Sequence, residues 1–277
     1  MSAGVKFDLG AKFVLIGAVA TQQSNRALAM YNAGIRNLHI PGHYFGFKVQ
    51  DLPSAVNAFQ TLDFKGFTVS MPYKQEVVSL VDRLSEDARV IGAVNTVVND
   101  HGVLYGHNTD WIGAINALKA KTGLYEKKVV LIGAGGAARA IAFGLHKEQC
   151  KVTVLNRTES KAREIACQYN FEYGPFALLD QIKDFDILIN ATSVGAEDNL
   201  TKKKVPLKCL VPGQYILDIV ADPSHTDLVL EGKKKGCSVI TGLEMLIFQA
   251  IEQFRLFFGN TPSYQSLKQG YLRCKTP

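Results

Sequence analysis

The chain has 277 residues, of which 47% are hydrophobic and 20% charged, with 24 glycines and 9 prolines. This composition excludes a disordered or fibrous protein, and the length predicts two domains, because single hydrophobic cores rarely grow so large. The net charge of +6 permits binding of an anion. The lysine runs Lys202–Lys204 and Lys233–Lys235 lack interleaved aromatic residues, so we expect a small-molecule partner and no nucleic acid.

No apolar run reaches the roughly 18 residues that span a membrane, so we expect no membrane partner. The stretch Phe13–Ala20 follows two lysines and imitates a secretory signal, but a buried first strand explains it more simply. The five cysteines are odd in number and widely spaced, which argues against a disulfide framework. The histidines form no cluster with metal-ligand spacing. We therefore expect a cytoplasmic protein without a metal site.

The first hundred residues alternate strand-like and helix-like patterns. The expected strands are Phe13–Ile16, His43–Val49 and Phe67–Met71, followed by a hairpin from Thr96–Val98 to Val103–Tyr105. The expected helices are Arg26–Ala33, ended by Gly34, then Leu52–Leu62 and Val77–Leu84.

From about Asp110 the alternation becomes more regular. The expected helices are Trp111–Lys121 and Lys161–Tyr169, and the expected strands are Lys128–Ile132, Lys151–Leu155, Ile187–Ile189 and Tyr215–Ile219. Strands that are apolar throughout and are followed by helices predict a parallel sheet covered on both faces, in a doubly wound α/β domain. A last helix is expected to begin with a capping box formed by Thr241 and Glu244.

A glycine-rich turn, Gly133–Ala138, directly follows the strand that ends at Ile132 and opens a helix. This strand–turn–helix setting is the one in which a dinucleotide is bound. Gly133 allows a tight turn, Gly135 allows the backbone to approach a pyrophosphate, and Ala138 allows close packing of helix on strand. The N–H groups at the start of the helix, from Gly136 and Ala137 onward, then favour the phosphate charge.

The end of the second strand of this domain indicates the cofactor. An NAD site presents Asp or Glu there for the ribose 2′-hydroxyl, whereas this chain has Asn156, Arg157 and Thr158. Arg157 can bind the oxygens of a 2′-phosphate, and Lys161 adds positive charge one turn later. These residues favour NADP over NAD.

The chain resembles the shikimate dehydrogenase family over nearly its whole length, and most closely the shikimate dehydrogenase-like branch. The matching blocks are Gly66–Lys74, Gly92–Thr96, Gly106–Asp110, Gly133–Arg139, Asn156–Thr158, Asn190–Gly195, and Gly242–Leu246 with Gln249. The resemblance implies an NADP-dependent enzyme of aromatic amino-acid (chorismate) synthesis that interconverts 3-dehydroshikimate and shikimate, or a related cyclic hydroxy-acid. It also implies two α/β domains and a C-terminal helix that returns to the first: 1–109 with 243–277 for substrate, and 110–242 for NADP. The family includes monomers and homodimers.

By this resemblance, Lys74 and Asp110 are the catalytic acid–base pair, because reducing a ketone by hydride needs a proton donor at the developing alkoxide. Ser70, Asn95 and Gln249 match residues that hold the substrate. The cofactor-binding residues that the resemblance and the turn together predict are Gly133, Gly135, Gly136, Ala137, Asn156, Arg157, Thr158, Lys161, Thr192, Ser193 and Gly242.

The chain departs from the family in the loop after its first strand, where two serines usually bind the substrate carboxylate. It has Thr21, Gln22, Ser24 and Asn25 there, of which Thr21 and Ser24 are the candidates we retain, with Arg26 as a possible carboxylate partner. It also has Ala221 where a tyrosine is usual, and Trp111 where a glycine is common. Two alternatives follow: a quinate-type dehydrogenase that uses NAD, and a non-catalytic sensor that binds dinucleotide.

Overall fold

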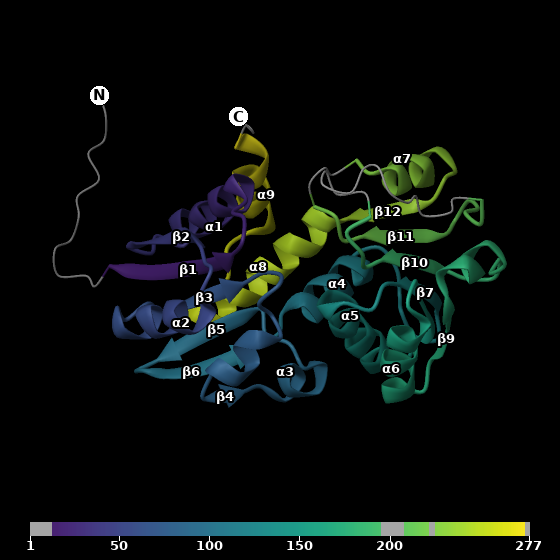
Figure 1. The fold of residues 1–277 in the computed structure, drawn as a ribbon. Coiled ribbons are helices and arrows are strands. Elements are labelled where there is room, and N and C mark those ends of the chain that lie inside the picture. The colour runs from purple at the N-terminus through teal and green to yellow at the C-terminus, as the bar shows by residue number, and fades with distance from the viewer. Residues whose placement is uncertain (1–12, 195–207, 222–224, 275–277) are drawn as a thin grey trace, which may run out of the picture. The chain divides into compact units, whose positions relative to one another are not determined.

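A computed structural model describes residues 13–194, 208–221 and 225–274 of the chain (Figure 1). Contacts divide the chain into two compact units, each with one six-stranded sheet. The first unit draws on Met1–Leu84, Val94–Gly106 and Phe254–Pro277, and the second on Ser85–Ala93 and His107–Gln253. The predicted α/β class with two domains is confirmed. None of the described helices is both long enough and apolar enough to cross a membrane.

The first unit contains strands and helices from both ends of the chain. Its elements are β1 (Val14–Ala20), α1 (Asn25–Asn37), β2 (Gly42–Lys48), α2 (Leu52–Thr61), β3 (Gly66–Val69), a 3₁₀ helix (Glu76–Leu80), β4 (Arg83–Leu84), β5 (Thr96–Asp100), β6 (Val103–His107) and α9 (Tyr264–Arg273). The strand order is β2-β1-β3-β5-β6-β4. Strand β1 is parallel to β2 and β3, whereas β5 is antiparallel to β3. The amino end of β5 therefore lies beside the carboxyl end of β3.

The predicted hairpin is present, with β5 and β6 as neighbours in the sheet. The two residues between them, His101 and Gly102, both have positive φ, at 52° and 88°. A type I′ turn requires this conformation, and its twist matches that of the strands. The side chain of Asn99 strengthens the turn by accepting a 2.8 Å hydrogen bond from the Gly102 N–H.

Two predictions in this part of the chain are wrong. Helix α1 does not end at Gly34 but continues to Asn37. A Cβ on Gly34 would come within 2.6 Å of the Phe254 ring. The glycine therefore permits close packing and does not end the helix. The stretch 77–84 is not one helix: it contains the short 3₁₀ helix and β4. The helix begins later, as α3 (Glu86–Ile91), where Ser85 accepts a capping hydrogen bond from the Ala88 N–H at 3.2 Å.

The second unit is built on an all-parallel sheet with the strand order β12-β11-β10-β7-β8-β9. Its elements are α3, α4 (Asp110–Lys119), β7 (Lys128–Ile132), α5 (Gly136–Lys147), β8 (Lys151–Asn156), α6 (Glu159–Tyr169), β9 (Glu172–Pro175), a 3₁₀ helix (Phe176–Asp180), β10 (Ile187–Asn190), β11 (Tyr215–Asp218), α7 (Asp227–Lys234) and β12 (Ser238–Thr241). This is the doubly wound order, in which the sheet grows outward in both directions from its first strand. The crevice at which the order reverses lies between β7 and β10.

Both faces of this sheet are buried, as its continuous apolar strands predict. On β7, Val129 and Leu131 pack into a cluster with residues of α4, α5 and α6, while Val130 and Ile132 pack into a second cluster on the opposite face. Helix α8 (Gly242–Phe258) follows β12, and its residues from Phe254 onward belong to the first unit. Its expected capping box is formed in part: Glu244 accepts from the Thr241 N–H at 2.8 Å and from the Thr241 hydroxyl at 3.1 Å.

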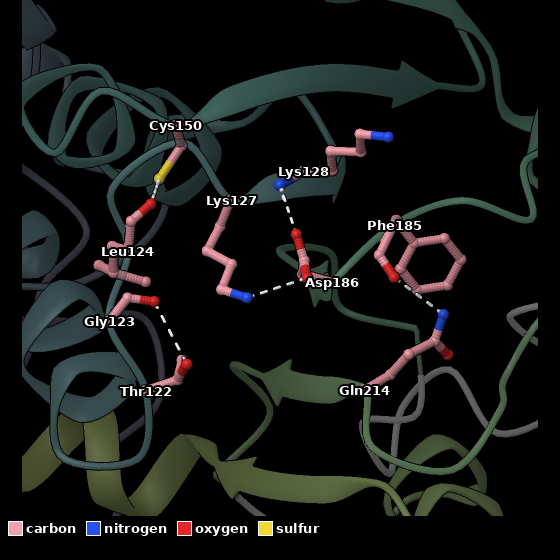
Figure 2. A network of polar contacts seen from close by, with 9 residues as sticks. All are labelled: Thr122, Gly123, Leu124, Lys127, Lys128, Cys150, Phe185, Asp186 and Gln214. Atoms are coloured by element: carbon pink, nitrogen blue, oxygen red, sulfur yellow. Dashed lines mark hydrogen bonds and ion pairs between the residues drawn. The ribbon is translucent and has the colours of Figure 1, made fainter.

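Polar contacts fasten the amino ends of the central strands (Figure 2). Asp186, just before β10, accepts hydrogen bonds from the Lys127 ammonium at 3.0 Å and from the Lys128 backbone N–H at 2.9 Å. Partial burial raises the pKa of Asp186, but these donors outweigh it, so the net pKa lies below the ordinary value. Gln214 donates to the Phe185 carbonyl at 3.0 Å and so attaches the start of β11. These contacts join the amino ends of β7, β10 and β11.

Candidate cofactor-binding and catalytic residues

The glycine-rich turn lies at the crevice of the second unit. Gly133 follows β7 with a φ of +115°, and a Cβ at this position would lie 2.8 Å from the carbonyl oxygen of Ala191 and 3.1 Å from Thr192. Both the positive φ and the close approach require glycine. The turn after β7 and the loop after β10 are therefore in contact at the point where doubly wound sheets bind dinucleotides.

The amino end of α5 has room and donors for phosphate. Gly135 is the N-cap, Gly136 is the first helical residue, and a Cβ built on either would meet no described atom within 4 Å. The first turn, Gly136–Arg139, carries no acidic side chain, so the helix dipole and the N–H groups favour an anion. Ala138 is buried in the cluster that contains Val129 and Leu131, as expected of a residue that allows helix and strand to pack closely. These residues fit a pyrophosphate.

The end of β8 carries the residues that we expect to bind the adenosine ribose. Asn156 is the last strand residue, and its side chain donates to the Thr158 carbonyl at 2.9 Å, which shapes the loop into α6. Arg157, Thr158 and Lys161 are exposed. The loop thus presents two solvated cations, which suit a 2′-phosphate.

Asn190, at the carboxyl end of β10, organises the loop that follows it. Its Oδ1 accepts from the Thr192 hydroxyl at 2.6 Å and from the Thr192 N–H at 3.2 Å. The Thr192 hydroxyl in turn accepts from the Val194 N–H at 3.1 Å. These bonds hold the backbone around Thr192 and Ser193, two predicted cofactor residues, beside the glycine-rich turn. Gly195 and Lys202–Lys204 lie outside the described residues.

Asp218 ends β11 and is the register partner of Asn190. Both side chains are completely buried. Asp218 accepts hydrogen bonds from the Asn190 amide at 3.0 Å, the Val220 N–H at 3.2 Å and the Thr226 hydroxyl at 2.5 Å. Burial raises the pKa of Asp218, and the three donors oppose this increase. Gly242, the remaining predicted cofactor residue, packs closely here, because a Cβ on it would lie 2.4 Å from the Ile219 carbonyl oxygen.

In the first unit, main-chain hydrogen bonds bring three predicted site residues together at the carboxyl end of β3. The Val69 N–H donates to the Asn95 carbonyl at 2.8 Å, and the Val94 N–H donates to the Lys74 carbonyl at 2.7 Å. The Ser70 N–H donates to the Val19 carbonyl of β1 at 2.9 Å. Ser70 is exposed, Lys74 is half-buried and Asn95 is buried. The structure therefore groups Ser70 and Lys74, which are close in the sequence, with Asn95, which belongs to a separate block.

Two buried hydroxyl contacts lie on the strands next to this group. The Thr96 hydroxyl donates to Oδ1 of Asn95 at 2.8 Å. The hydroxyl of Tyr44, on β2, lies 2.5 Å from the hydroxyl of Thr68, which is the register partner of Thr96. Burial raises the pKa of Tyr44, so its phenol stays neutral. Together these groups form a polar stripe across the sheet that leads to Asn95.

The loop after β1 is largely occupied by contacts of its own. Gln23 donates to the carbonyls of Ala18 at 3.1 Å and Phe47 at 2.7 Å, and so joins β1 to β2. The Ser24 hydroxyl caps α1 by accepting from the Ala27 N–H at 3.2 Å. Arg26 lies over the ring of Tyr271, 5.9 Å from its centroid, while Thr21 is exposed. Ser24 thus has a capping role that explains its presence without a substrate.

In the second unit the structure joins two predicted residues, Asp110 and Gln249. Asp110 opens α4 and is 2% exposed, and the Gln249 amide donates to its Oδ1 at 2.9 Å. Gly113 makes this possible, because a Cβ there would lie 2.4 Å from Cγ of Gln249, so α4 and α8 pack closely. The amide of Gln249 thus holds the Asp110 carboxylate in place at the start of α4.

Sequence reasoning did not assign roles to Asn190, Thr226, Thr96, Thr68 or Tyr44. Asn190 and Asp218 each end an apolar strand, and a polar residue at that position is the one signal that could have indicated them. The residues that form hydrogen bonds with Tyr44 and Asp218, such as Thr68 and Asn190, are too distant in the sequence for their spacing to predict the contacts.

Three family models match the chain, and together they cover most of it. The family model for the shikimate dehydrogenase substrate binding domain matches residues 20–97, and the model for shikimate / quinate 5-dehydrogenase matches residues 116–223. A model for the shikimate 5'-dehydrogenase C-terminal domain matches residues 242–269. The shikimate dehydrogenase (NADP(+)) of Pyrococcus furiosus is 42% identical over 241 residues, which cover 87% of this chain and 88% of that protein.

Solved structures give the same result. A shikimate dehydrogenase in complex with NADP+ has a TM-score of 0.89 and 30% identity, and the similarity covers 100% of both chains. The ligand-free 5-ketofructose reductase of a Gluconobacter strain has a TM-score of 0.86 and 33% identity, covering 95% of this chain and 99% of that one. The chain therefore belongs to the shikimate dehydrogenase family.

Proposed function

We propose that the protein is an NADP-dependent oxidoreductase that interconverts 3-dehydroshikimate and shikimate, or a closely related cyclic hydroxy-acid. The observation that carries this proposal is the uncrowded start of α5 at the doubly wound crevice, where a Cβ on Gly135 or Gly136 would meet no described atom within 4 Å. The named function of the 42% identical relative supports the substrate. The proposed division assigns residues 1–109 with 243–277 to the substrate and 110–242 to NADP.

The cofactor supplies and accepts hydride, and the chain supplies the proton chemistry. The Lys74 ammonium is proposed to donate a proton to the developing alkoxide of the ketone and to accept it in reverse. Asp110 is proposed to keep that ammonium charged and oriented. Ser70, Asn95 and Gln249 would hold the hydroxyl groups of the substrate.

NADP is preferred to NAD because of the residues that follow β8. Arg157 and Lys161 are exposed and can bind a 2′-phosphate, while Asn156 stands where an NAD site places a carboxylate. The NADP-dependent relative and the NADP+-bound structural neighbour support this choice. The NAD-dependent quinate reaction remains the alternative within this class.

A second substrate class is favoured by the loop after β1. The serine pair that usually receives a carboxylate is missing, Gln23 is bonded to two backbone carbonyls, and Ser24 caps α1. A polyhydroxy ketone without a carboxylate needs no such receptor. The 33% identity to a 5-ketofructose reductase supports this second candidate.

Steady-state rates with shikimate, quinate and 5-ketofructose, each with NADP(H) and NAD(H), test the proposal. We expect NADP-dependent turnover with shikimate to exceed that with the other two. A preference for 5-ketofructose would instead favour the second candidate, in which the substrate is a polyhydroxy ketone. Binding of NADP without turnover of any substrate would instead favour a dinucleotide sensor.

We also propose a cytoplasmic location and a monomer or homodimer acting in aromatic amino-acid synthesis. None of the five cysteines, which all fall within the described ranges, forms a disulfide. Thiols persist in a reducing compartment. Fractionation of cells and light scattering of the purified protein test these two points.

A further inference from the structure

The buried carboxylate of Asp218 lies beneath the half of the crevice that the adenosine residues do not use. We propose that its negative charge strengthens binding of the oxidised, cationic nicotinamide ring relative to the neutral reduced ring. This inference rests on the proposed binding of NADP. It assigns to Asp218 an electrostatic role in addition to its contacts with the loops around it.

The contacts of Asp218 are those of an ionised carboxylate. Thr226 accepts from the Val229 N–H at 3.2 Å, so its one hydroxyl proton is directed to Asp218. The Asn190 amide and the Val220 N–H can only donate. Burial raises the pKa of Asp218, and these three donors reduce the increase, so that the net pKa lies above its ordinary value. Within the described ranges, none of its contacts is with a lysine, arginine or histidine, so no neighbouring cation cancels the charge.

The strand order places this charge under the nicotinamide half of the ligand. A dinucleotide lies across the crevice of a doubly wound sheet, with one mononucleotide on each half. The phosphate turn follows β7 and the ribose-binding residues follow β8, so the adenosine half belongs to the β7-β8-β9 side. The other half then belongs to β10, β11 and β12. Asn190 and Asp218 end β10 and β11, at the carboxyl edge of this half of the sheet.

A fixed charge acts strongly there because Asp218 is completely buried and little water screens it. An elementary charge acting over about 10 Å in protein changes a binding equilibrium by roughly 10-fold. The reduced ring is neutral and gains nothing from the carboxylate. The charge thus favours the oxidised form on the protein, and with it the reduction of the ketone.

The test is the ratio of two dissociation constants, Kd for NADP+ over Kd for NADPH, measured by calorimetry without substrate. In Asp218→Asn we expect the ratio to rise by about 10-fold, mainly because NADP+ binds more weakly. If this variant does not fold by circular dichroism, Asp218→Ser provides a second neutral side chain with the same expected direction.

Two control variants distinguish an effect of the Asp218 charge from an effect of Asp218 on the structure of the nearby loops. Asp186→Asn removes a carboxylate at the amino end of the same sheet, and we expect the ratio to stay at the wild-type value. Thr192→Val loosens the loop after β10 without touching Asp218, and we expect both dissociation constants to rise by similar factors. If Asp218→Asn also raises both equally, Asp218 only shapes the loop and the inference is wrong. Failure of the wild type to bind either form would instead overturn the proposed function.

Discussion

The hydroxyl of Thr96 donates a 2.8 Å hydrogen bond to the side-chain oxygen of the residue before it, Asn95. This bond fixes the orientation of the side-chain amide that we propose to hold the substrate. Thr96 is completely buried, so the bond is not exchanged with bulk water. Thr96 is thus a positioning residue for Asn95.

Thr96→Val keeps the shape of the side chain and removes the hydroxyl. We expect the KM for shikimate to rise by about 5- to 10-fold, the equivalent of one hydrogen bond, because the Asn95 amide can then rotate. The Kd for NADP should not change. Thr96→Ser should restore the wild-type KM, and a Thr96→Val enzyme with unaltered KM would remove this role from Thr96.

Lys74→Ala removes the proposed proton donor. We expect kcat to fall by roughly 10²- to 10⁴-fold, the usual contribution of a general acid or base, with the Kd for NADP unchanged. Lys48→Ala, which removes an exposed lysine at the end of β2, should keep the wild-type kcat. Near-normal turnover in Lys74→Ala would exclude Lys74 from the chemistry.

Arg157→Ala removes a cation from the loop after β8. We expect the KM for NADP to rise by about 10-fold or more while the KM for NAD changes little, because only NADP carries the 2′-phosphate. Arg163→Ala, an exposed arginine further along α6, is the matched control and should leave both values unchanged. Equal increases for the two cofactors would contradict 2′-phosphate recognition by Arg157.

Gly133→Ala should lower the stability of the protein, whereas Gly135→Ala should abolish NADP binding. At Gly133 the φ of +115° and the contact with Ala191 make a Cβ costly, so we expect the free energy of unfolding to fall by about 1–3 kcal/mol. At Gly135 the backbone is extended and a Cβ meets no described atom, so stability should hold while NADP binding is lost. Urea unfolding and calorimetry measure the two effects, and identical behaviour of the variants would count against this reading of the turn.

Asp186→Asn should weaken the amino edge of the second sheet in a pH-dependent way. The folded-state pKa of Asp186 lies below its ordinary value, so its contribution is present above the ordinary pKa and is lost as pH falls through the folded pKa. We expect the variant to lose about 1 kcal/mol of unfolding free energy at pH 7, because the ion pair is partly exposed. The difference should vanish in urea titrations at pH values below the folded-state pKa, and a constant difference would refute the electrostatic origin.

Local patterns in the sequence predict much of this molecule. The apolar runs at Lys128–Ile132 and Lys151–Asn156 need only their neighbours to form buried strands, and Gly133–Ala138 directly marks the turn between strand and helix. Short elements escape the same reasoning. Strand β4 has only two residues, too few for periodicity, and β9 (Glu172–Pro175) lacks the continuous apolar run that marks the equally short β10 and β11.

The candidate site depends on contacts between distant residues, and these the sequence does not display. Asn190 and Asp218 are 28 positions apart, and Asp110 and Gln249 are 139 apart, yet each pair shares a hydrogen bond. Ser24 can be assigned a role from its position alone, because a serine just before a helix is typical of an N-cap, and the structure has this cap. The substrate contact that the resemblance implies for Ser24 stays a prediction.

The path of α8 has a consequence for synthesis on the ribosome. Its residues up to Gln253 complete the second unit, but those from Phe254 onward, with α9, belong to the first. Gly34 on α1 packs against Phe254, and Gly66 on β3 packs against Phe257. The elements of the first unit that precede α3 must therefore wait for α8 and α9, which are translated later, before their core can close.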